Sequence, residues 1–289
     1  MNTTHRIEEA LEWAVIKAER PGAPPTLGRA IRHAVFPGGA RVRPRVCLAV
    51  AAACGDDEPL VADCAAAGIE LLHCASLVHD DLPCFDDAEL RRGRPSVHAL
   101  FGEAIAVLAG DALIVSAFDV LSRALERAPT RSAPLLGLLT RASGSPLGLV
   151  AGQAWESEPS SCREEYHRAK TGSLFTAATV GGALAAGADP APWRTLGDRL
   201  GEAYQVADDL RDAVAEESEI GKPVGQDAEH LRPNAVADLG VAGAVARLQQ
   251  LVNEAVESIP ECRGAHGLRR LVELQVKRLT PKALQETAA

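Results

Sequence analysis

AAAGIELLHCASLV, at residues 65–78, carries small or apolar side chains on almost every side of a helix. A helix that is apolar all round belongs inside a bundle rather than on its surface. Apolar residues also recur at helical spacing through most of the remaining chain, and Gly or Pro clusters separate these segments. The sequence therefore predicts an all-α fold, a large helical bundle with one or two nearly buried central helices.

The composition favours the same fold. Hydrophobic residues make up 47% of the chain and aromatic residues only 3%, so the core must be aliphatic, and Ala and Leu are strong helix formers. We expect helices near residues 4–19, 26–36, 42–54, 60–80, 97–127, 131–152, 161–187, 192–215, 230–257 and 265–278. Because 289 residues show no composition shift and no linker, we expect a single domain over residues 1–289.

Charge and cysteine usage restrict the class of protein. The net charge of −9 argues against a general nucleic-acid surface, so an anionic ligand would need bridging cations. Seven cysteines without a CxxC pair indicate neither a disulfide framework nor a zinc site. The N-terminus lacks the features of a secretory signal, and apolar stretches such as 104–118 are interrupted by Asp or too short to span a bilayer. We expect a soluble, cytoplasmic protein without a transmembrane segment.

The central apolar helix leads into an acidic stretch, HDDLPCFDDAELRRGRP at residues 79–95. Asp80, Asp81 and Asp86 cannot share one face of a regular helix, because six residues place the last of them about 120° away. Pro83 should end or bend the helix near Asp81, so that the following loop brings Asp86 back toward the first pair. The stretch then supplies three guanidinium groups suited to phosphate oxygens, on Arg91, Arg92 and Arg94.

A second acidic stretch, YQVADDLRD, follows at residues 204–212. Asp208 and Asp212 are four residues apart and lie on one helical face, with Asp209 beside them. Like charges in this arrangement repel, and a bound cation is the simplest compensation. Oxygen ligands without His or Cys suit Mg²⁺, which also takes substrate phosphates. The two stretches together predict a magnesium-dependent diphosphate site.

With these motifs the chain resembles the trans-isoprenyl diphosphate synthases, which condense isopentenyl diphosphate onto an allylic diphosphate. The resemblance covers nearly the whole chain and rests on motifs in the family's order: GGARVRP (38–44), DDLPCFDDAELRRGRP (80–95), GQ (152–153), KTG (170–172), YQVADDLRD (204–212) and GKPVGQD (221–227). Within the family, HCASLVHDDLPCFDDAELRRGRP is most similar to bacterial geranylgeranyl diphosphate synthases of carotenoid and photosynthetic pigment pathways. The resemblance implies the isoprenoid synthase fold, with a central active-site cavity, and a homodimer.

The resemblance also implies roles for individual side chains. It assigns three Mg²⁺ around the allylic diphosphate to Asp80, Asp81, Asp86 and Asp208, with Asp209 and Asp212 nearby. It assigns contacts with the same diphosphate to Arg91, Lys170 and Lys222. It assigns isopentenyl diphosphate to Arg43, His73 and Arg92, and the lining of the reacting region to Thr171 and Gln205.

The chain departs from the family at Ala40. The usual GGKR reads GGAR here, so the lysine that commonly contacts isopentenyl diphosphate is missing. Arg41 or Arg43 are the alternatives for supplying its charge. We expect weaker binding of isopentenyl diphosphate rather than loss of activity.

Product length is implied by the residues one turn before Asp80. In the family the prenyl tail grows along the central helix, and Ala75 and Ser76 take the place of the tunnel floor. Similar short-chain synthases often carry an aromatic residue five positions before the first aspartate, which stops growth at fifteen carbons. Alanine leaves the tunnel open, and we expect a twenty-carbon product from dimethylallyl, geranyl or farnesyl diphosphate.

Other interpretations stay open. Taken singly, an acidic cluster is more often a solvated loop, and His73 in an apolar helix is more often a hydrogen-bonded core residue; His79 caps or orients Asp80 as an alternative to any substrate role. A farnesyl diphosphate synthase, a terpene cyclase and an inactive partner subunit of an active synthase are the rival functions. A cyclase needs an aromatic-lined cavity, which three Trp, two Tyr and five Phe supply poorly. Inactive partners typically lose one aspartate cluster, whereas this chain keeps both.

Overall fold

The structure is a computed structural model that describes residues 2–36, 38–158, 163–214 and 234–279. It confirms the predicted all-α fold. The chain divides into two compact units, Met1–Leu139 with Gly181–Ala188, and Thr140–Val180 with Asp189–Ala289, and each unit is described by itself. The single domain expected from the sequence stays a prediction.

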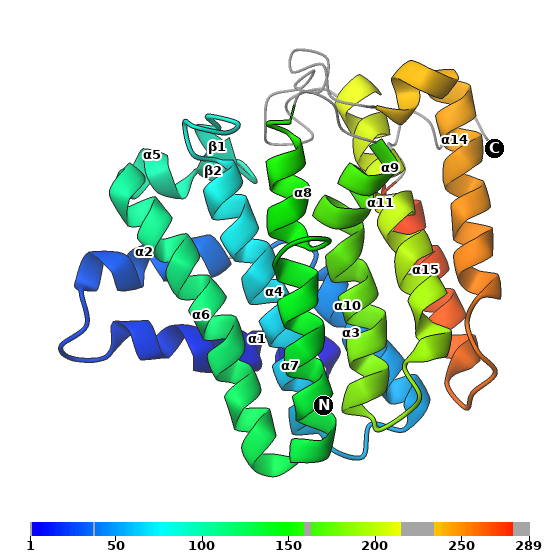
Figure 1. The fold of residues 1–289 in the computed structure, drawn as a ribbon, viewed down its shortest axis with the longest axis horizontal. Coiled ribbons are helices and arrows are strands. Elements are labelled where there is room, and N and C mark those ends of the chain that lie inside the picture. Colours follow the sequence, from blue (N-terminus) through cyan, green and yellow to red (C-terminus); the bar gives the residue numbers. More distant parts are fainter. Residues whose placement is uncertain (1, 37, 159–162, 215–233, 280–289) are drawn as a thin grey trace. The chain divides into compact units, whose positions relative to one another are not determined.

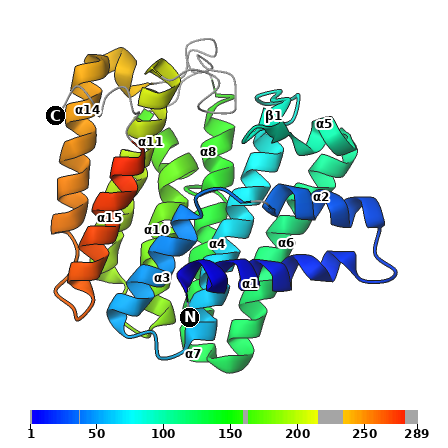
Figure 2. The ribbon, with the colours of Figure 1, turned by 180° about the vertical axis from the view of Figure 1, so that it is seen from behind.

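The first unit is built around one buried helix, α4. Its elements are α1 (Thr3–Val15), η1 (Ile16–Glu19), α2 (Pro25–Val35), α3 (Val42–Cys54), α4 (Pro59–Asp80), β1 (Leu90–Arg91), β2 (Arg94–Pro95), α5 (Val97–Phe101), α6 (Glu103–Arg127) and most of α7 (Pro129–Ser143). Both ribbon views place α4, in cyan, between α3 and α6 (Figures 1 and 2). Every residue from 64 to 72 is buried, as the uniformly apolar sequence predicts. A Cβ atom at Gly68 would lie 2.9 Å from a terminal methyl of Leu139 and 3.2 Å from the carbonyl oxygen of Ala117, so glycine favours the close packing of α4 there.

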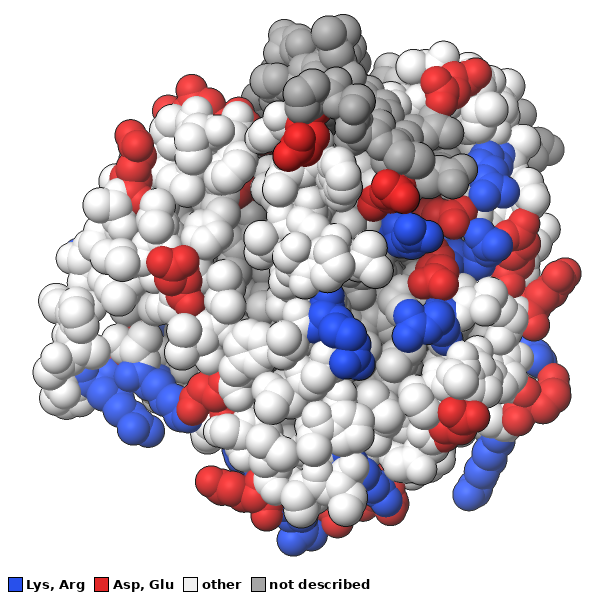
Figure 3. Space-filling model, viewed as in Figure 1, with Lys and Arg blue, Asp and Glu red and all other residues white. Residues whose placement is uncertain are grey.

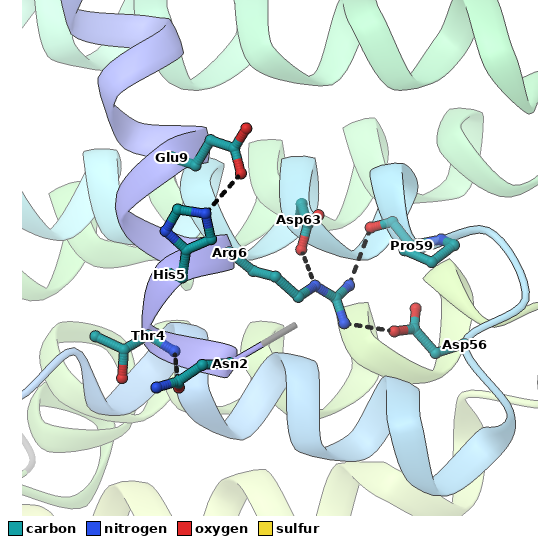
Figure 4. A network of polar contacts seen from close by, with 8 residues as sticks. All are labelled: Asn2, Thr4, His5, Arg6, Glu9, Asp56, Pro59 and Asp63. Carbon is teal, nitrogen blue, oxygen red and sulfur yellow. Dashed lines mark hydrogen bonds and ion pairs between the residues drawn. The ribbon is translucent and has the colours of Figure 1, made fainter.

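A polar cluster fastens the N-terminal helix to this core (Figure 4). Arg6 of α1 donates hydrogen bonds to Asp63 (2.7 Å) and Asp56 (2.7 Å) and to the carbonyl oxygen of Pro59 (3.2 Å). Burial raises the pKa of the Asp63 carboxyl above its ordinary value, although Arg6 pulls it down. One guanidinium thus compensates two partly buried carboxylates at the start of α4.

The second unit contains the other acidic stretch. Its elements are α8 (Leu149–Trp155), α9 (Arg163–His167), the π-helix η2 (Arg168–Gly172), the first half of α10 (Ser173–Ala185), η3 (Ala191–Trp193), α11 (Arg194–Val214), α14 (Ala235–Glu257) and α15 (Ala265–Leu279). Figure 2 shows α11, α14 and α15 side by side. Ala207 and Leu210 of α11 pack in one apolar core with Leu248 and Leu251 of α14.

Several predicted helices are interrupted. The helix expected over 97–127 breaks at Gly102, whose φ of 86° separates α5 from α6. The helix expected over 131–152 divides into α7 and α8, and the one over 161–187 contains the π-helix η2. The β1–β2 hairpin is an addition that strand patterns did not predict, because strands of two residues show no alternation to read.

Among the described residues, two helices, α4 and α6, are long and apolar enough by length and composition to cross a membrane. Over its most apolar stretch α4 is 78% buried inside the protein, which is typical of a core helix, whereas α6 is 39% buried. The outer face of α6 exposes Val107, Leu108 and Val115, at 42%, 51% and 68% of their surface. Figure 3 shows the corresponding largely uncharged surface over the middle of α6.

Candidate active site

The loop after α4 turns back on the helix, as predicted. Asp80 is the last residue of α4, and Asp81 follows as its cap. The backbone N–H of Asp86 donates to the carbonyl oxygen of Asp80 (3.0 Å), and that of Ala88 donates to the carbonyl oxygen of Asp81 (3.1 Å). These two bonds bring the backbone of the third aspartate beside that of the first pair.

Asp81 is the buried member of this first cluster. Its side chain is 3% exposed and accepts hydrogen bonds from two nitrogens of Arg91, with Nε at 2.8 Å. Burial raises the pKa of the Asp81 carboxyl, Arg91 lowers it, and the charges of Asp80 and Asp86 raise it further. A carboxylate whose charge is unfavourable despite a guanidinium partner is suited to gain from a bound cation.

The β1–β2 hairpin presents Arg92 to the glycine loop before α3. A Cβ atom on Gly39 would lie 2.8 Å from the guanidinium carbon of Arg92. His73 on α4 is half-buried, and its pKa is held well below the ordinary value by burial and then by nearby cations, Arg43 and Arg92 foremost. The structure thus brings together Arg43, His73 and Arg92, the three side chains expected to bind isopentenyl diphosphate. Ala40 is exposed on the same loop.

Arg41 does not replace the missing lysine charge. It is 4% exposed, and its guanidinium donates to Glu70 (2.9 Å), Glu8 (2.9 Å) and the carbonyl oxygen of Val35 (2.8 Å). Two carboxylates and a carbonyl therefore hold this side chain inside the first unit. Of the two alternatives for the charge, only Arg43 remains.

Two further expectations in the first unit are modified. Arg94 bonds to protein groups, the carbonyl oxygen of Phe36 and the ring of His33, rather than extending as a phosphate ligand. His79 packs on α6 instead of capping Asp80, since a Cβ on Gly110 would lie 2.0 Å from its ring. Long-range contacts of this kind leave no trace in the local sequence pattern.

The proposed tunnel floor lies on α4. Ala75 is 1% exposed, and Ser76 is half-buried with its hydroxyl donating to the carbonyl oxygen of His73 (2.8 Å). Both side chains are small, and the Ser76 hydroxyl bonds within its own helix. Their role in product length stays a prediction.

In the second unit, Lys170 and Thr171 lie on the π-helix η2. A Cβ on Gly152, from the GQ motif, would come within 2.3 Å of the Lys170 backbone nitrogen, and one on Gly201 within 2.6 Å of Gly172. The glycines therefore allow α8 and α11 to approach η2 closely. Single π-turns within helices occur frequently at functional sites.

Glu156 holds Lys170, and sequence reasoning missed it. Its carboxylate accepts from the Lys170 ammonium (2.6 Å), the Tyr166 hydroxyl (2.6 Å) and the Gln153 amide (2.7 Å). The Glu156 side chain is 11% exposed. The available signal was its position three residues after the GQ motif.

A chain of hydrogen bonds runs from η2 to α14 through the second acidic stretch. The Thr171 hydroxyl donates to Gln205 (2.8 Å), whose amide donates to Asp209 (2.9 Å). The other oxygen of Asp209 accepts the backbone N–H of Ala235 (2.7 Å), and Asp209 is 1% exposed. The Asp208 side chain is 53% exposed, with Arg211 at 3.8 Å.

Asp212 is half-buried one turn further along α11. Lys222, predicted to contact the allylic diphosphate, lies outside the described residues. The site residues that are described fall into two groups, one in each unit: Arg43, His73, Asp80, Asp81, Asp86, Arg91 and Arg92 in the first, and Lys170, Thr171, Gln205, Asp208, Asp209 and Asp212 in the second.

The carboxylate sets fit Mg²⁺ in donor chemistry. In the part of the chain that the structure describes, no three His, Cys, Asp or Glu side chains converge closely enough to hold an ion by themselves. Mg²⁺ does not require such a cage, because it keeps waters and is usually bound through one or two carboxylates plus substrate phosphates. Burial, and after it the charges of Asp80 and Asp86, raise the pKa of the Asp81 carboxyl, so its ionised form would gain from such an ion.

Comparison with known proteins agrees with the motifs. Residues 24–265 match the polyprenyl synthetase family. The chain is 52% identical to the geranylgeranyl diphosphate synthase of Cereibacter sphaeroides over 96% of each chain, and 48% identical to that of Rhodobacter capsulatus over 94% and 96%. A Helicobacter pylori geranyltransferase, solved with magnesium and isoprenyl diphosphate, superposes with a TM-score of 0.81 at 29% identity over 96% of each chain. On the extent of these matches, the chain belongs to the polyprenyl synthetase family.

Proposed function

We propose that the protein is a magnesium-dependent prenyltransferase that condenses isopentenyl diphosphate with dimethylallyl, geranyl or farnesyl diphosphate and releases geranylgeranyl diphosphate. The observation that carries the proposal is the pair of aspartate clusters in a chain 52% identical to a geranylgeranyl diphosphate synthase. Each cluster lies in the same compact unit as a predicted phosphate-binding cation, Arg91 in one and Lys170 in the other.

The carboxylates are assigned to metal binding. Asp80, Asp81, Asp86 and Asp208 would hold Mg²⁺, three ions per active site, with Asp209 and Asp212 supporting them. When bound, these ions supply positive charge to the diphosphate as it departs. Asp209 acts mainly as a scaffold, because both of its oxygens accept hydrogen bonds from protein groups.

The remaining side chains bind and orient the two substrates. Arg91, Lys170 and Lys222 contact the allylic diphosphate and stabilise the charge that grows on it. Arg43, Arg92 and a neutral His73 hold isopentenyl diphosphate, while Thr171 and Gln205 line the reacting region. The allylic C–O bond breaks, the alkene attacks the allylic carbon to form the new C–C bond, and pyrophosphate accepts the proton that is lost.

The twenty-carbon product is argued from the small side chains of Ala75 and Ser76, at the positions where similar short-chain synthases carry a larger residue that stops growth. A farnesyl diphosphate synthase remains the rival, with a fifteen-carbon product. The catalytically inactive partner subunit is the second rival, and Ala40 is the residue that favours it.

We assign the protein as a homodimer, the state that the sequence resemblance implies. On α6, Val107, Leu108 and Val115 expose apolar side chains around the exposed Asp111. A cytoplasmic location is supported by thiols at Cys47, Cys64, Cys74, Cys84 and Cys262 that form no disulfide. Supply of carotenoid or pigment synthesis is the pathway role that the sequence resemblance implies.

The test is the mass of the product formed by purified protein with Mg²⁺, isopentenyl diphosphate and each allylic primer in turn. We expect a twenty-carbon diphosphate that disappears with a chelator, and a shift toward fifteen carbons in Ala75→Tyr. A fifteen-carbon product from the unmodified protein would favour the farnesyl alternative. No condensation with any primer would favour the inactive partner, and a cyclic hydrocarbon would indicate a cyclase.

A further inference from the structure

The tip of the β1–β2 hairpin has an unusual backbone. Arg92 has a φ of 55° and Gly93 a φ of 72°, and Arg91 pairs with Arg94 across the turn. Positive φ at both central residues is the pattern of a two-residue hairpin turn, in which glycine suits the second position and arginine is uncommon at the first. Arg92, the side chain expected to bind isopentenyl diphosphate, therefore depends on whatever fixes this hairpin.

Two side chains, Arg94 and His33, fix it. One guanidinium nitrogen of Arg94 donates to the carbonyl oxygen of Phe36 (3.1 Å), and another donates to Nδ1 of His33 (3.1 Å). With Nδ1 accepting, the His33 ring carries its proton on Nε2, which donates to the carbonyl oxygen of Pro95 (2.8 Å). We call Arg94, His33 and the Phe36 carbonyl the hairpin brace.

The brace reaches both sides of the isopentenyl diphosphate site. Phe36 ends α2 shortly before the glycine loop, and Gly39 of that loop lies against the Arg92 guanidinium. The bonds from Arg94 to Phe36 and to His33, and from His33 to Pro95, thus tie the hairpin that carries Arg92 to the end of α2, which precedes the glycine loop and Arg43. Edge-on packing of the His33 ring against Phe101, with centroids 5.7 Å apart, fixes the ring from the other side.

We propose that Arg94 and His33 are positioning residues for isopentenyl diphosphate, holding Arg92 and the glycine loop in the arrangement that binds its diphosphate. The inference rests on the proposed function. Because Ala40 provides no charge, binding depends on fewer cations here, and an error in the placement of Arg92 is less well compensated.

An open groove lies next to the brace. Two of the arginines that line it are already paired with protein groups, which favours a structural role for Arg94 over a separate anion site. The volume of the groove is about 740 Å³, and its walls include Arg29, Arg32, His33 and Arg94. Arg32 is paired with two carboxylates, Glu12 and Glu19, and Arg94 is engaged in the brace. Arg29 lines the same groove but bonds to Thr26 on its own helix (3.4 Å), which makes it a matched control.

The experiment measures steady-state kinetics of Arg94→Met, Arg94→Lys, His33→Phe and Arg29→Met. Arg94→Met removes both donors, and we expect the KM for isopentenyl diphosphate to rise about tenfold, in line with the loss of hydrogen bonds from a charged group. The kcat and the KM for the allylic substrate should stay within about twofold, which is the split expected for lost ground-state binding. Arg94→Lys should fall between, and Arg29→Met should match the unmodified protein.

Direct binding separates failure of the brace from failure of the proposed function. The Kd of isopentenyl diphosphate, measured by calorimetry without turnover, should rise by the same factor in Arg94→Met and in His33→Phe. The double variant should be no weaker than the weaker single one, because both residues act through one brace. His33→Phe keeps the ring against Phe101 and carries the test if Arg94→Met does not fold.

Unchanged KM and Kd in both variants would overturn the inference while leaving the enzyme. A fall in kcat together with a rise in both KM values and a fall in thermal stability would also overturn it. That pattern indicates a general structural role. If the unmodified protein forms no product and binds no isopentenyl diphosphate, the proposed function itself fails.

Discussion

In the cluster at the end of α4 the second aspartate, Asp81, is buried against the guanidinium of Arg91, whereas in the cluster on α11 the second aspartate, Asp209, is buried against an amide and a backbone N–H. The first pairing sets charge against charge: burial raises the pKa of the Asp81 carboxyl, Arg91 lowers it, and the neighbouring charges of Asp80 and Asp86 raise it further. The second pairing joins η2 to the start of α14. Two similar sequence motifs thus bury the same position for different purposes, electrostatic in one and scaffolding in the other.

The largest effect is expected at the first aspartate of each motif. Asp80→Asn and Asp208→Asn should each lower kcat by at least about a hundredfold, because each removes charge that stabilises the departing diphosphate. Steady-state assays at saturating substrates measure it. Asp87→Asn, in the same loop and with its side chain 68% exposed, is the control and should change kcat little. Equal kcat values for Asp208→Asn and Asp87→Asn would remove the second cluster from the mechanism.

Arg6 with Asp56 and Asp63 is a partly buried guanidinium–carboxylate cluster without a predicted catalytic role. It serves as a reference for the two aspartate clusters. Arg6→Met should lower the free energy of unfolding by about 3 kcal/mol at neutral pH, since it leaves Asp63 and Asp56 without their partner. Urea denaturation would measure the loss, and kcat per folded molecule should not change.

The loss in Arg6→Met should shrink in acid. Burial already raises the pKa of Asp63 in the folded protein, so its folded state binds a proton more readily than its unfolded state does. Stability from this group is therefore fully present below the unfolded pKa and is lost as the pH rises through the raised folded pKa. Removing Arg6 takes away the cation that lowers this pKa, so the variant should recover toward the unmodified protein as the pH falls. A loss that is independent of pH would contradict this account.

Asp209 and Asp81 should respond differently to the same substitution. Asp209→Asn places an amide donor against one of two existing donors, and we expect it to cost about 1–3 kcal/mol of stability. Asp81→Asn should cost at least as much stability, about 3 kcal/mol, because it leaves the Arg91 guanidinium without its partner charge. Its kcat should fall more than that of Asp209→Asn. Denaturation curves and steady-state kinetics on the same preparations measure both quantities. A larger loss of kcat in Asp209→Asn than in Asp81→Asn would refute the division of purposes.

The smallest effect is expected at Ala40, on the isopentenyl side. Ala40→Lys adds a cation on the exposed loop beside Gly39 and should lower the KM for isopentenyl diphosphate by about threefold to tenfold, with kcat unchanged. Ala40→Met, which adds length without charge, is the control. An unchanged KM in Ala40→Lys would show that Arg43 and Arg92 already satisfy the diphosphate.

Much of the fold was predictable from local pattern. The apolar run that led to a buried central helix is buried from residue 64 to 72, and the proline after Asp81 correctly indicated a loop that returns Asp86. The breaks inside long predicted helices were missed, because a single glycine is tolerated in a helix and Gly102 therefore gave no clear sign of the break that its φ of 86° makes.

The partners of charged side chains were less predictable. Arg41 bonds to Glu70, 29 residues away in the sequence, and Arg94 bonds to His33, 61 residues away. No local periodicity encodes such pairs. The motifs thus pointed to candidate site residues, whereas the structure shows which polar side chains are held by other protein groups. Arg41, Asp209 and Arg94 are held in this way.

The most direct test of the central claim is calorimetric binding of a non-reacting allylic diphosphate analogue with and without Mg²⁺. The unmodified protein should bind it much more tightly with Mg²⁺, and Asp80→Asn and Asp208→Asn should each remove most of that gain, with the double variant little worse than either. Such coupling would show that both clusters serve one diphosphate through the metal. Binding whose dependence on Mg²⁺ survives in Asp208→Asn would contradict the account.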